Sequence, residues 1–364
     1  MVAGPPVMVT HALGRYPVYI EPGVLGRLES LSEEHLGRGH ITMIADAAVH
    51  ELLQAGRLAR PRWEGDAVTF PAGEGSKNRK EWARITDLLL ERGVGRDGGI
   101  IALGGGVAGD LAGFVAATYL RGIPFIQVPT SLLAMVDASV GGKTGVNTRH
   151  GKNLVGAFHH PAAVVADPRV LLTLPERDYR GGLAEAVKHG LIADAEYFGW
   201  MEREAGALLR RDTEALTHLA RRSVEIKAEV VSADERETGR RAILNAGHTV
   251  AHALEQATAF ELSHGEAVSL GLVAECALAE AMGVAAAGMR GRVSSLLERF
   301  GLPVRLAKRV EEAALLSAMA RDKKNRMARI RFALPSAIGC MSAEAGWTHA
   351  AEEVAIRSAL ATIS

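Results

Sequence analysis

The sequence predicts an α/β N-terminal domain, built on a largely parallel sheet, followed by an all-α C-terminal domain. Up to about residue 175, short apolar or β-branched runs alternate with helical stretches, as in β-α-β units. After Pro175, helix-forming residues recur at helical spacing instead. The chain has 364 residues, which exceeds the size at which one hydrophobic core usually stops growing. We therefore expect two domains, at residues 1–177 and 178–364.

Each predicted strand is a short run of buried-type residues bounded by helical or turn-forming segments. The predicted strands are residues 18–20, 41–45, 68–70, 100–103, 125–128 and 164–166. In the second half, Leu216, Leu219 and Val224 illustrate the helical spacing. One late run, residues 330–334, alternates and is followed by Pro335, which predicts a short strand there.

Composition excludes several classes of protein. Hydrophobic residues make up 48% of the chain, and 42 basic residues balance 42 acidic ones, so neither disorder nor a nucleic-acid partner is expected. The sequence has no signal-peptide pattern at its start and no uninterrupted membrane-length apolar run, which predicts no membrane role. Two cysteines, Cys276 and Cys340, cannot form a disulfide framework. We expect a cytoplasmic enzyme.

A glycine-rich turn follows the predicted strand at residues 100–103 and precedes a predicted helix. Gly104, Gly106 and Gly109 fit the G-x-G-x-x-G pattern, whose glycines let a pyrophosphate approach backbone N–H groups at a helix N-terminus. The acid that would hold the ribose is missing from the next strand, but Asp46, at the end of an earlier strand, can take that role. The alternative is a turn that serves packing only.

Two other segments carry groups suited to anions. Residues 73–77 form a second glycine-containing turn with a lysine after a predicted strand. Lys143 and Lys152 lie in a stretch of small and apolar residues, where a charge is costly unless it is paired or binds a ligand. Phosphate is the natural ligand for such lysines. The alternative is that they are solvated loop residues.

Two histidines four residues apart, His248 and His252, lie in an apolar run that should be helical. With His264 and Glu185, His248 can form a three-ligand metal site with an open position, as catalytic zinc sites have. His252 can be a fourth ligand or a free acid/base group. Ser263 and Glu266 fit a capping box, which would place His264 in the first turn of a helix.

Polar residues expected near this metal can bind a carboxylate and hydroxyl groups. Arg241 and Asn245 are expected to share a helical face with His248 or to lie near it. The complete group is Lys188, Lys227, Glu237, Arg241 and Asn245.

These motifs resemble the sugar-phosphate cyclases, and most closely the 3-dehydroquinate synthase family of the shikimate pathway. The resemblance covers nearly the whole chain, from Asp46 to Lys324. Its motifs are residues 73–77, 104–110, 119–122, 127–130, 136–147, 151–153, 182–188 and 245–252. It implies a Rossmann-like NAD-binding α/β domain, an all-α metal- and substrate-binding domain, a divalent metal (Zn or Co) and a homodimer.

The resemblance also implies roles for individual residues. The implied metal ligands are Glu185, His248 and His264. The implied NAD contacts are Asp46, Glu74, Lys77, Gly106, Val107, Ala108, Gly109, Asp110, Thr130, Ser131, Asp137, Lys143, Lys152, Val170, Leu171, Leu172 and Thr173. The implied catalytic and substrate-binding residues are Lys143, Lys152, Asn153, Lys188, Lys227, Arg241, Asn245, His252 and a lysine of the Lys323-Lys324 pair, here taken as Lys324, with Arg121 supplied across the dimer.

The implied reaction converts 3-deoxy-D-arabino-heptulosonate 7-phosphate to 3-dehydroquinate and phosphate, a carbon–oxygen lyase step of aromatic amino acid biosynthesis. Oxidation of the C5 alcohol transfers hydride from C5 to NAD, phosphate is eliminated from C7, the hydride returns, and the opened ring closes by an intramolecular aldol step. Lys152, Asn153 and His252 would hold the phosphate, and Lys227 and Arg241 the C1 carboxylate.

Three alternatives fit part of the pattern. Another sugar-phosphate cyclase would act on a substrate without a carboxylate, which would leave Lys227 and Arg241 without that partner. A metal-dependent polyol dehydrogenase would share the glycine turn and the metal but would need no cationic side chains for a neutral substrate. An NAD-binding regulatory module would leave the metal ligands and lysines without a role.

Overall fold

The computed structural model describes residues 4–59, 61, 63–320 and 330–364. These residues form two compact units, one of residues 1–175 with 216–232 and the other of residues 176–215 with 233–364. The domain boundary predicted after residue 177 stays a prediction. Within the described helices, none is long and apolar enough to cross a membrane.

The first unit is built on a seven-stranded sheet with the order β1-β2-β9-β6-β5-β3-β4. Only β1 is antiparallel to its neighbour; every other pairing is parallel. The strands are β1 (Val7–His11), β2 (Gly14–Ile20), β3 (Ile41–Asp46), β4 (Val68–Phe70), β5 (Gly99–Gly104), β6 (Phe125–Pro129) and β9 (Ala163–Ala166). The predicted α/β fold class, with its parallel sheet and helical C-terminal region, is confirmed.

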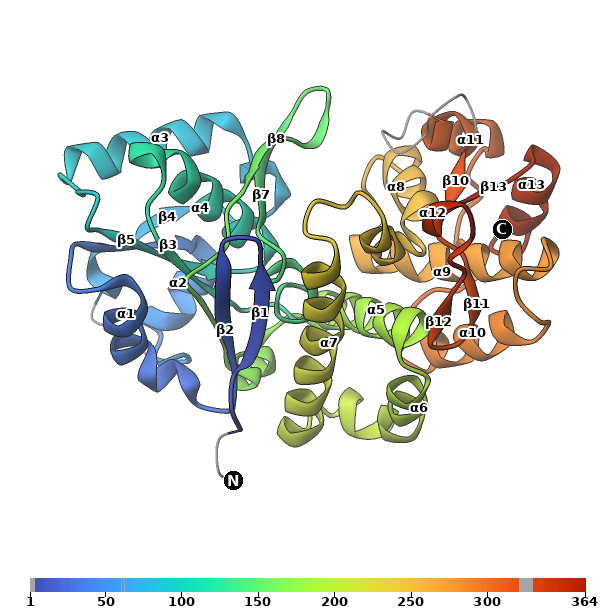
Figure 1. The fold of residues 1–364 in the computed structure, drawn as a ribbon, viewed down its shortest axis with the longest axis horizontal. Coiled ribbons are helices and arrows are strands. Elements are labelled where there is room, and N and C mark those ends of the chain that lie inside the picture. Colours follow the sequence, from blue (N-terminus) through green and yellow to red (C-terminus); the bar gives the residue numbers. More distant parts are fainter. Residues whose placement is uncertain (1–3, 60, 62, 321–329) are drawn as a thin grey trace. The chain divides into compact units, whose positions relative to one another are not determined.

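Helices cover this sheet because their apolar faces need burial. The helices are α1 (Leu28–Leu36), α2 (Ala47–Gln54), α3 (Arg79–Glu91) and α4 (Gly106–Thr118). Figure 1 shows α3 and α4 on one side of the sheet and α1 on the other. Ile85 and Leu89 of α3 and Leu111 and Val115 of α4 pack with Phe125 of β6 in one buried core cluster. Such burial contributes about 1.5–3 kcal/mol for each large apolar side chain.

A two-stranded hairpin, β7 (Lys143–Thr148) and β8 (Gly151–Phe158), also belongs to the first unit. The hairpin is absent from the strands predicted above, because its glycines obscure the strand pattern. Gly145 lies opposite Gly156, and a Cβ on Gly156 would overlap the carbonyl oxygen of Thr144. The pairing therefore needs glycine for a reason that is visible only in the folded chain.

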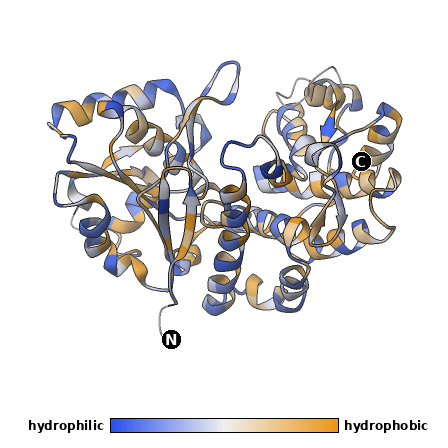
Figure 2. Ribbon diagram, viewed as in Figure 1, coloured by the Kyte–Doolittle hydropathy of each residue, from blue (hydrophilic) through white to orange (hydrophobic). Residues whose placement is uncertain are grey.

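Helix α7 (Thr213–Ala233) contributes residues 216–232 to the first unit. Its Ser232 hydroxyl donates to the Thr10 carbonyl oxygen at 3.0 Å, and Arg221 donates to the Pro5 carbonyl oxygen at 2.9 Å. Figure 2 shows hydrophilic and hydrophobic residues along α7, as expected of an amphipathic helix.

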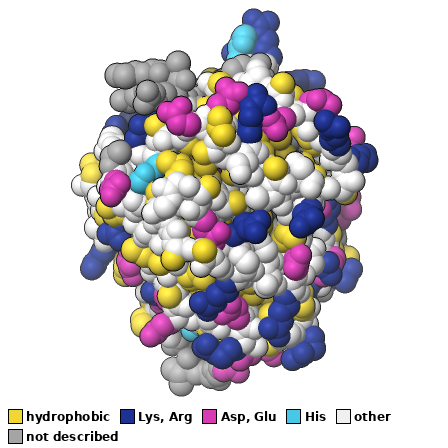
Figure 3. Space-filling model, turned by 90° about the vertical axis from the view of Figure 1, so that its right-hand side faces the viewer, with side chains coloured by type: hydrophobic (Ala, Val, Ile, Leu, Met, Phe, Trp, Pro, Cys, Tyr) yellow, Lys and Arg dark blue, Asp and Glu magenta, His cyan; other side chains and the backbone are white. Residues whose placement is uncertain are grey.

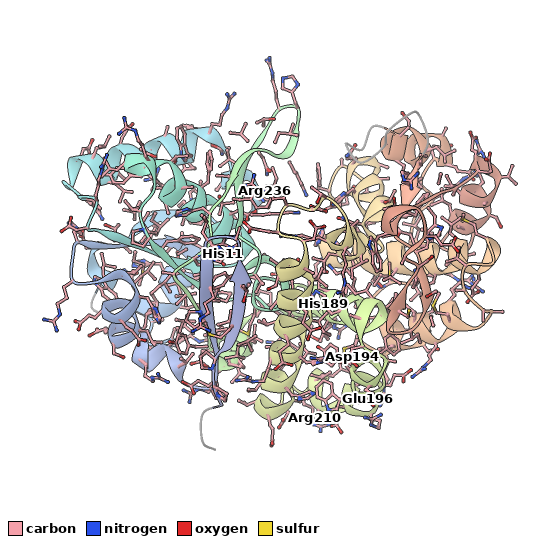
Figure 4. All side chains as sticks on the ribbon, viewed as in Figure 1. His11, His189, Asp194, Glu196, Arg210 and Arg236 are labelled. Carbon is pink, nitrogen blue, oxygen red and sulfur yellow. The ribbon has the colours of Figure 1, made fainter. Side chains whose placement is uncertain are left out.

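The second unit consists mainly of helices. They are α5 (Glu176–Ala193), α6 (Ala195–Leu209), α8 (His248–Ala257), α9 (His264–Ala281), α10 (Met289–Arg299), α11 (Glu312–Ala320), α12 (Glu344–Trp347) and α13 (Glu353–Ala361). Asp194 separates α5 from α6 and caps α6 by accepting from the Tyr197 N–H at 2.9 Å (Figure 4). On one face of the molecule, acidic and basic side chains are interspersed (Figure 3), in keeping with the balanced composition.

Short strands also occur in this unit, beyond the predicted helices. They are β10 (Arg331–Phe332), β11 (Pro335–Ala337), β12 (Cys340–Met341) and β13 (His349–Ala350), paired as β10 with β13 and β11 with β12. The strand predicted at residues 330–334 is present as β10. Pro335, expected to end that strand, begins β11 instead, a position that a proline can occupy at a strand start.

Two helix crossings in this unit depend on glycine. A Cβ on Gly265 of α9 would overlap the backbone of Gly181 in α5, and a Cβ on Gly271 of α9 would overlap the carbonyl oxygen of Gly247, the residue before α8. Helix α9 therefore contacts both α5 and the start of α8 through backbone atoms.

Replacing Gly265 by alanine is expected to lower the free energy of unfolding by about 1–3 kcal/mol, because the added methyl group forces two helix backbones apart. Gly291, in α10, is the matched control, since a Cβ there meets no atom within 4 Å. Gly291→Ala should stabilise by about 0.5–1 kcal/mol. Thermal unfolding of both variants tests this, and an unchanged midpoint for Gly265→Ala would contradict the close crossing.

Candidate functional site

The glycine turn lies at the carboxyl edge of the sheet in the first unit. Strand β5 ends at Gly104 and α4 begins at Gly106, so the predicted order of strand, glycine turn and helix is present, and the helix already includes part of the glycine run. A Cβ on Gly104 would lie 2.7 Å from the Ala108 Cβ and 3.1 Å from the Asp46 Cβ, so this position needs glycine. The N-terminus of α4 thus presents backbone N–H groups without obstruction, which suits a phosphate group.

Several residues predicted to contact NAD gather around this turn. Asp46 ends β3, which neighbours β5, and its side chain accepts from the Ala48 N–H at 2.9 Å. The Thr130 N–H donates to the Gly104 carbonyl oxygen at 2.9 Å, and a Cβ on Gly105 would lie 3.2 Å from the Ser131 hydroxyl oxygen. A small pocket here is lined by Ala102, Gly104, Gly105, Gly106, Gly109, Gln127, Val128, Pro129, Ala134, Ala138 and Ser139.

The second predicted turn, residues 73–77, is joined to α4 by an ion pair. The Lys77 ammonium lies 3.0 Å from an Asp110 carboxylate oxygen and 3.1 Å from Glu74 Oε1. Burial of Lys77 disfavours its charged form, but Asp110 and Glu74 outweigh that effect and raise the pKa of the amine. Asn147 donates to Glu74 Oε1 at 2.7 Å, which ties the end of β7 to this cluster.

Other predicted residues of the first unit lie on different elements. Lys143 begins β7 and is exposed, whereas Lys152 and Asn153 lie in β8, where the Asn153 N–H donates to Asn147 Oδ1 at 3.0 Å. Val170, Leu171, Leu172 and Thr173 lie in a 3-10 helix, η6 (Pro168–Thr173), that follows β9.

Lys227 lies 2.8 Å from Asp137 Oδ1, so in this structure it neutralises a carboxylate of the protein.

Arg121 is not brought to the glycine turn. It is exposed in η4 (Tyr119–Arg121), directly after the last residue of α4. Helix α4 has 13 residues, and at about 1.5 Å per residue its two ends are about 20 Å apart. Gly106 and Arg121 therefore lie at opposite ends of the helix.

The second unit contains a cluster of potential metal ligands: Glu185 of α5 and two histidines, His248 and His264, which begin α8 and α9. One donor atom from each of the three residues lies within 4.8 Å of the others. His264 Nε2 is 3.1 Å and His248 Nε2 is 3.5 Å from Glu185 Oε1. His189, one turn beyond Glu185 on α5 (Figure 4), is buried but does not belong to this group.

Both histidine rings are held through the nitrogen that faces away from Glu185. His248 Nδ1 lies 3.2 Å from the Ala246 carbonyl oxygen and donates to it. His264 Nδ1 lies 3.6 Å from Glu255 Oε1. The donor set of one carboxylate and two imidazole Nε2 atoms fits a divalent metal such as zinc or cobalt.

The charges of the cluster follow from its burial and its neighbours. Burial favours a neutral Glu185, but Lys188, His248 and His264 outweigh it and hold the pKa of the carboxyl well below its usual range. Burial, aided by the Lys188 charge, lowers the pKa of His248 to about 4, which keeps this ring neutral. For His264, burial opposes protonation, but Glu185 and Glu255 raise its pKa to about 9. Metal binding at neutral pH would therefore displace a proton from His264.

Lys188 and Glu185 form an ion pair on α5 and are both almost fully buried. A buried ammonium of this kind is costly unless it has such a partner.

The predicted capping box at the start of α9 is confirmed, since Ser263 and Glu266 exchange both hydrogen bonds. Glu266 is also bound by Arg177 of α5, at 2.6 Å, which joins the two helices that carry Glu185 and His264.

Arg241 and Asn245 do not share a helix with His248, so of the two expectations only a position near His248 stays a prediction. They lie in a separate 3-10 helix, η7 (Arg240–Asn245), and Gly247, with φ 79°, turns the chain before α8 begins. The left-handed conformation of Gly247 interrupts the helical path there, and its carbonyl oxygen lies where a Cβ on Gly271 of α9 would be.

Arg241 is nevertheless well held. Its N–H donates to Asp234 Oδ2 at 3.0 Å, and its guanidinium donates to the Glu235 carbonyl oxygen. The Asn245 amide donates to Glu237 Oε1 at 2.7 Å.

His252 lies one turn after His248, with ring centroids 5.5 Å apart. Lys323 and Lys324 lie outside the described residues.

Sequence reasoning missed Glu255 and Asp234. Glu255 follows His248 at i+7 and His252 at i+3, so helical spacing alone could have placed it on their face. Asp234 accepts from the N–H groups of Thr238, Gly239 and Arg241, a pattern without a signal in the sequence.

Comparisons with known proteins agree across the chain. A family model described as 3-dehydroquinate synthase N-terminal matches residues 67–181, and one described as 3-dehydroquinate synthase C-terminal matches residues 182–325. The chain is 49% identical over 325 residues to the 3-dehydroquinate synthase of Halorhodospira halophila, covering 89% of this chain and 91% of that protein. It is 46% identical over 328 residues to that of Symbiobacterium thermophilum, covering 88% and 91%.

Solved structures give the same picture of the fold. A 2-deoxy-scyllo-inosose synthase complexed with carbaglucose-6-phosphate, NAD+ and Co2+ has a TM-score of 0.87 at 25% identity, covering 98% of this chain and 99% of that one. A 2-epi-5-epi-valiolone synthase from Streptomyces hygroscopicus, with NAD+ and Zn2+ bound, has a TM-score of 0.83 at 29% identity, covering 96% of each.

Proposed function

Because the chain belongs to the 3-dehydroquinate synthase family, we propose that it converts 3-deoxy-D-arabino-heptulosonate 7-phosphate to 3-dehydroquinate and phosphate. It is then a lyase of the shikimate pathway that takes part in chorismate and aromatic amino acid biosynthesis. Family membership over both units is the observation that carries the proposal, because relatives named for this activity match most of the chain.

We propose that the first unit binds NAD at the glycine turn. The unobstructed N-terminus of α4 supports a pyrophosphate position at residues 106–110, and Asp46 at the end of β3 supports a ribose contact. Thr130 and Ser131 lie against this turn, and the Glu74, Lys77 and Asp110 cluster adjoins α4. We assign Asp137, Lys143, Lys152 and residues 170–173 to the same cofactor on the family resemblance.

We propose that the second unit binds a divalent metal, zinc or cobalt, through Glu185, His248 and His264. When bound, the metal supplies a Lewis acid and NAD a temporary hydride acceptor. The protein's part is to keep His248 neutral, to keep Glu185 ionised, and to hold both Nε2 atoms toward one point. We assign Lys188, paired with Glu185, to a hydrogen bond with a substrate oxygen near that point.

The remaining polar residues have proposed roles toward the substrate. We assign Lys152, Asn153 and His252 to the phosphate of the substrate. This phosphate acts as the base for its own elimination and then leaves. We assign Arg241, with Asn245 and Lys227, to the C1 carboxylate and hydroxyl groups. Arg241 is 2% exposed and keeps its charge, which suits a site for an anion. Lys324, which lies outside the described residues, completes the set on the resemblance alone.

We also propose a homodimer. Strand β8 carries Leu154, Val155 and Phe158, which are 40%, 38% and 43% exposed, and among the described strands it pairs with β7 alone. An exposed apolar strand edge is suited to a partner chain. The position of Arg121, at the far end of α4 from the glycine turn, supports its use in a partner's site. A cytoplasmic location is part of the proposal, in keeping with the free thiols of Cys276 and Cys340.

One assay tests the proposed activity. Purified protein loaded with NAD and metal is offered the heptulosonate phosphate, sedoheptulose 7-phosphate, glucose 6-phosphate and glycerol in turn. We expect phosphate release from the heptulosonate alone, without lasting NADH, because the hydride returns to the substrate. Lasting NADH from glycerol would indicate a polyol dehydrogenase, and phosphate release from an uncarboxylated sugar alone would indicate another cyclase.

A further inference from the structure

Helices α8 and α9 of the second unit each carry a buried carboxylate that the proposed chemistry does not use. Glu255 lies in α8 and is 4% exposed, and Glu275 lies in α9 and is 1% exposed. Each of them reaches the other helix, and each meets it beside a proposed metal ligand.

Glu255 of α8 faces His264, the first residue of α9. Its Oε1 is 3.6 Å from His264 Nδ1, whereas His264 Nε2 is 3.1 Å from Glu185 Oε1. A carboxylate that accepts from Nδ1–H fixes the ring orientation and the tautomer, and leaves the Nε2 lone pair for a metal. Glu255 therefore faces Nδ1 of His264 as a charged partner at ion-pair distance, on the side of the ring where His248 has its hydrogen bond to the Ala246 carbonyl oxygen.

Glu275 of α9 binds the start of α8, where His248 is the first residue. The Gly247 N–H donates to Glu275 Oε2 at 2.7 Å, and the N–H groups of Thr249 and Val250 donate to Oε1 at 3.2 and 3.3 Å. These are N–H groups at a helix start that have no partner within the helix, and they flank His248 on both sides.

The reach of Glu275 depends on the glycine contact between the two helices. Gly271 lies one turn before Glu275 on the same face of α9, and its missing Cβ lets the Gly247 carbonyl oxygen approach. The carboxylate then meets the α8 N-terminus directly.

We propose that Glu255 and Glu275 are positioning residues for the metal site: Glu255 orients the His264 ring, and Glu275 fixes the helix start that carries His248. This inference rests on the proposed metal ligands. It adds that the metal affinity of the protein depends on two carboxylates that do not touch the metal.

A matched control exists on the same helix. Glu280 of α9 also accepts from backbone N–H groups at the start of a neighbouring helix, from Gly288 at 3.1 Å and Arg290 at 2.8 Å. That helix, α10, carries no proposed ligand. Glu280→Gln therefore tests the loss of a helix-capping carboxylate without a change at the metal site.

The experiment measures the dissociation constant for Zn2+ by competition with a chelator, and thermal unfolding of the metal-free proteins. We expect Glu255→Ala to weaken binding about 10- to 100-fold, the usual effect of losing such an outer partner, and Glu255→Gln to recover part of the loss because its amide oxygen still accepts. Glu275→Gln should weaken binding about tenfold by the same principle. Glu280→Gln should lower the unfolding temperature as much as Glu275→Gln and leave zinc affinity unchanged.

A second readout is the tautomer of His264 in the metal-free protein at high pH, from 15N spectra of labelled histidine. In wild type the two carboxylates compete for the ring proton, Glu185 at Nε2 and Glu255 at Nδ1, so Glu255→Ala should raise the fraction of the Nε2–H tautomer. If Glu275→Gln does not fold, Glu275→Asp, which keeps the charge but reaches less far, takes its place with the same expectation.

His264→Ala distinguishes a failure of the proposed metal site from a failure of the proposed positioning role. If it binds zinc as wild type does, the proposed metal site itself is wrong. If it loses zinc while Glu255→Ala and Glu275→Gln behave like Glu280→Gln, the metal site stands and the positioning role of the two carboxylates is overturned.

Discussion

Replacing His264 by alanine is expected to lower turnover of the heptulosonate phosphate about a thousandfold, with loss of tight zinc or cobalt binding. A Lewis-acid metal contributes several kcal/mol to such a reaction, and about 1.4 kcal/mol corresponds to a factor of ten. The substitution should leave α9 intact, because alanine favours helix and the Ser263–Glu266 capping box is untouched. Steady-state kinetics with metal analysis of the purified protein measures both effects.

His40 provides the control for this substitution. It is exposed and lies in the first unit, apart from the ligand cluster. His40→Ala should retain wild-type turnover and metal content. A His264→Ala protein that kept both would show that the Glu185, His248 and His264 cluster is not the metal site.

Replacing Arg241 by alanine is expected to raise KM for the heptulosonate phosphate about 10- to 100-fold, with a smaller change in kcat. A hydrogen bond to a charged group contributes about 1.5–3 kcal/mol, and the C1 carboxylate would lose its guanidinium partner. The affinity for sedoheptulose 7-phosphate, measured by calorimetry, should change much less because this sugar has no carboxylate.

Arg240→Ala is the matched control, since Arg240 precedes Arg241 in the same 3-10 helix but is exposed. It should leave both affinities unchanged. Because Arg241 is buried and bound to Asp234 and Glu235, the unfolding temperature of each variant is measured alongside. An equal loss of affinity for the carboxylated and the uncarboxylated sugar would remove the assignment of Arg241 to the carboxylate.

The glycine turn could be predicted because its causes are local. A buried strand, three glycines and a helix follow one another within a few residues, and a helix N-terminus by itself favours an anion. The capping box at Ser263 is local in the same way, so the start of α9 at His264 could be predicted to the residue.

Features that depend on contacts distant in sequence could not be predicted. The pairing of Gly145 with Gly156 looks like a loop in the sequence, because glycine disfavours strands unless another backbone lies against it. The break between Asn245 and His248 has the same origin, since nothing in the apolar pattern shows that Gly271 lies against Gly247.

The sequence by itself determined the parallel α/β sheet, the glycine turn and the choice of three proposed metal ligands, because periodicity and short motifs act within a few residues. Only the tertiary structure decided how the ligands are oriented. Glu185 of α5, Glu255 of α8 and Glu275 of α9 meet the two histidines across helix crossings that glycines make possible. The orientation of the histidine side chains at this site depends on packing between helices, whereas a sequence pattern predicts only the individual helices and strands.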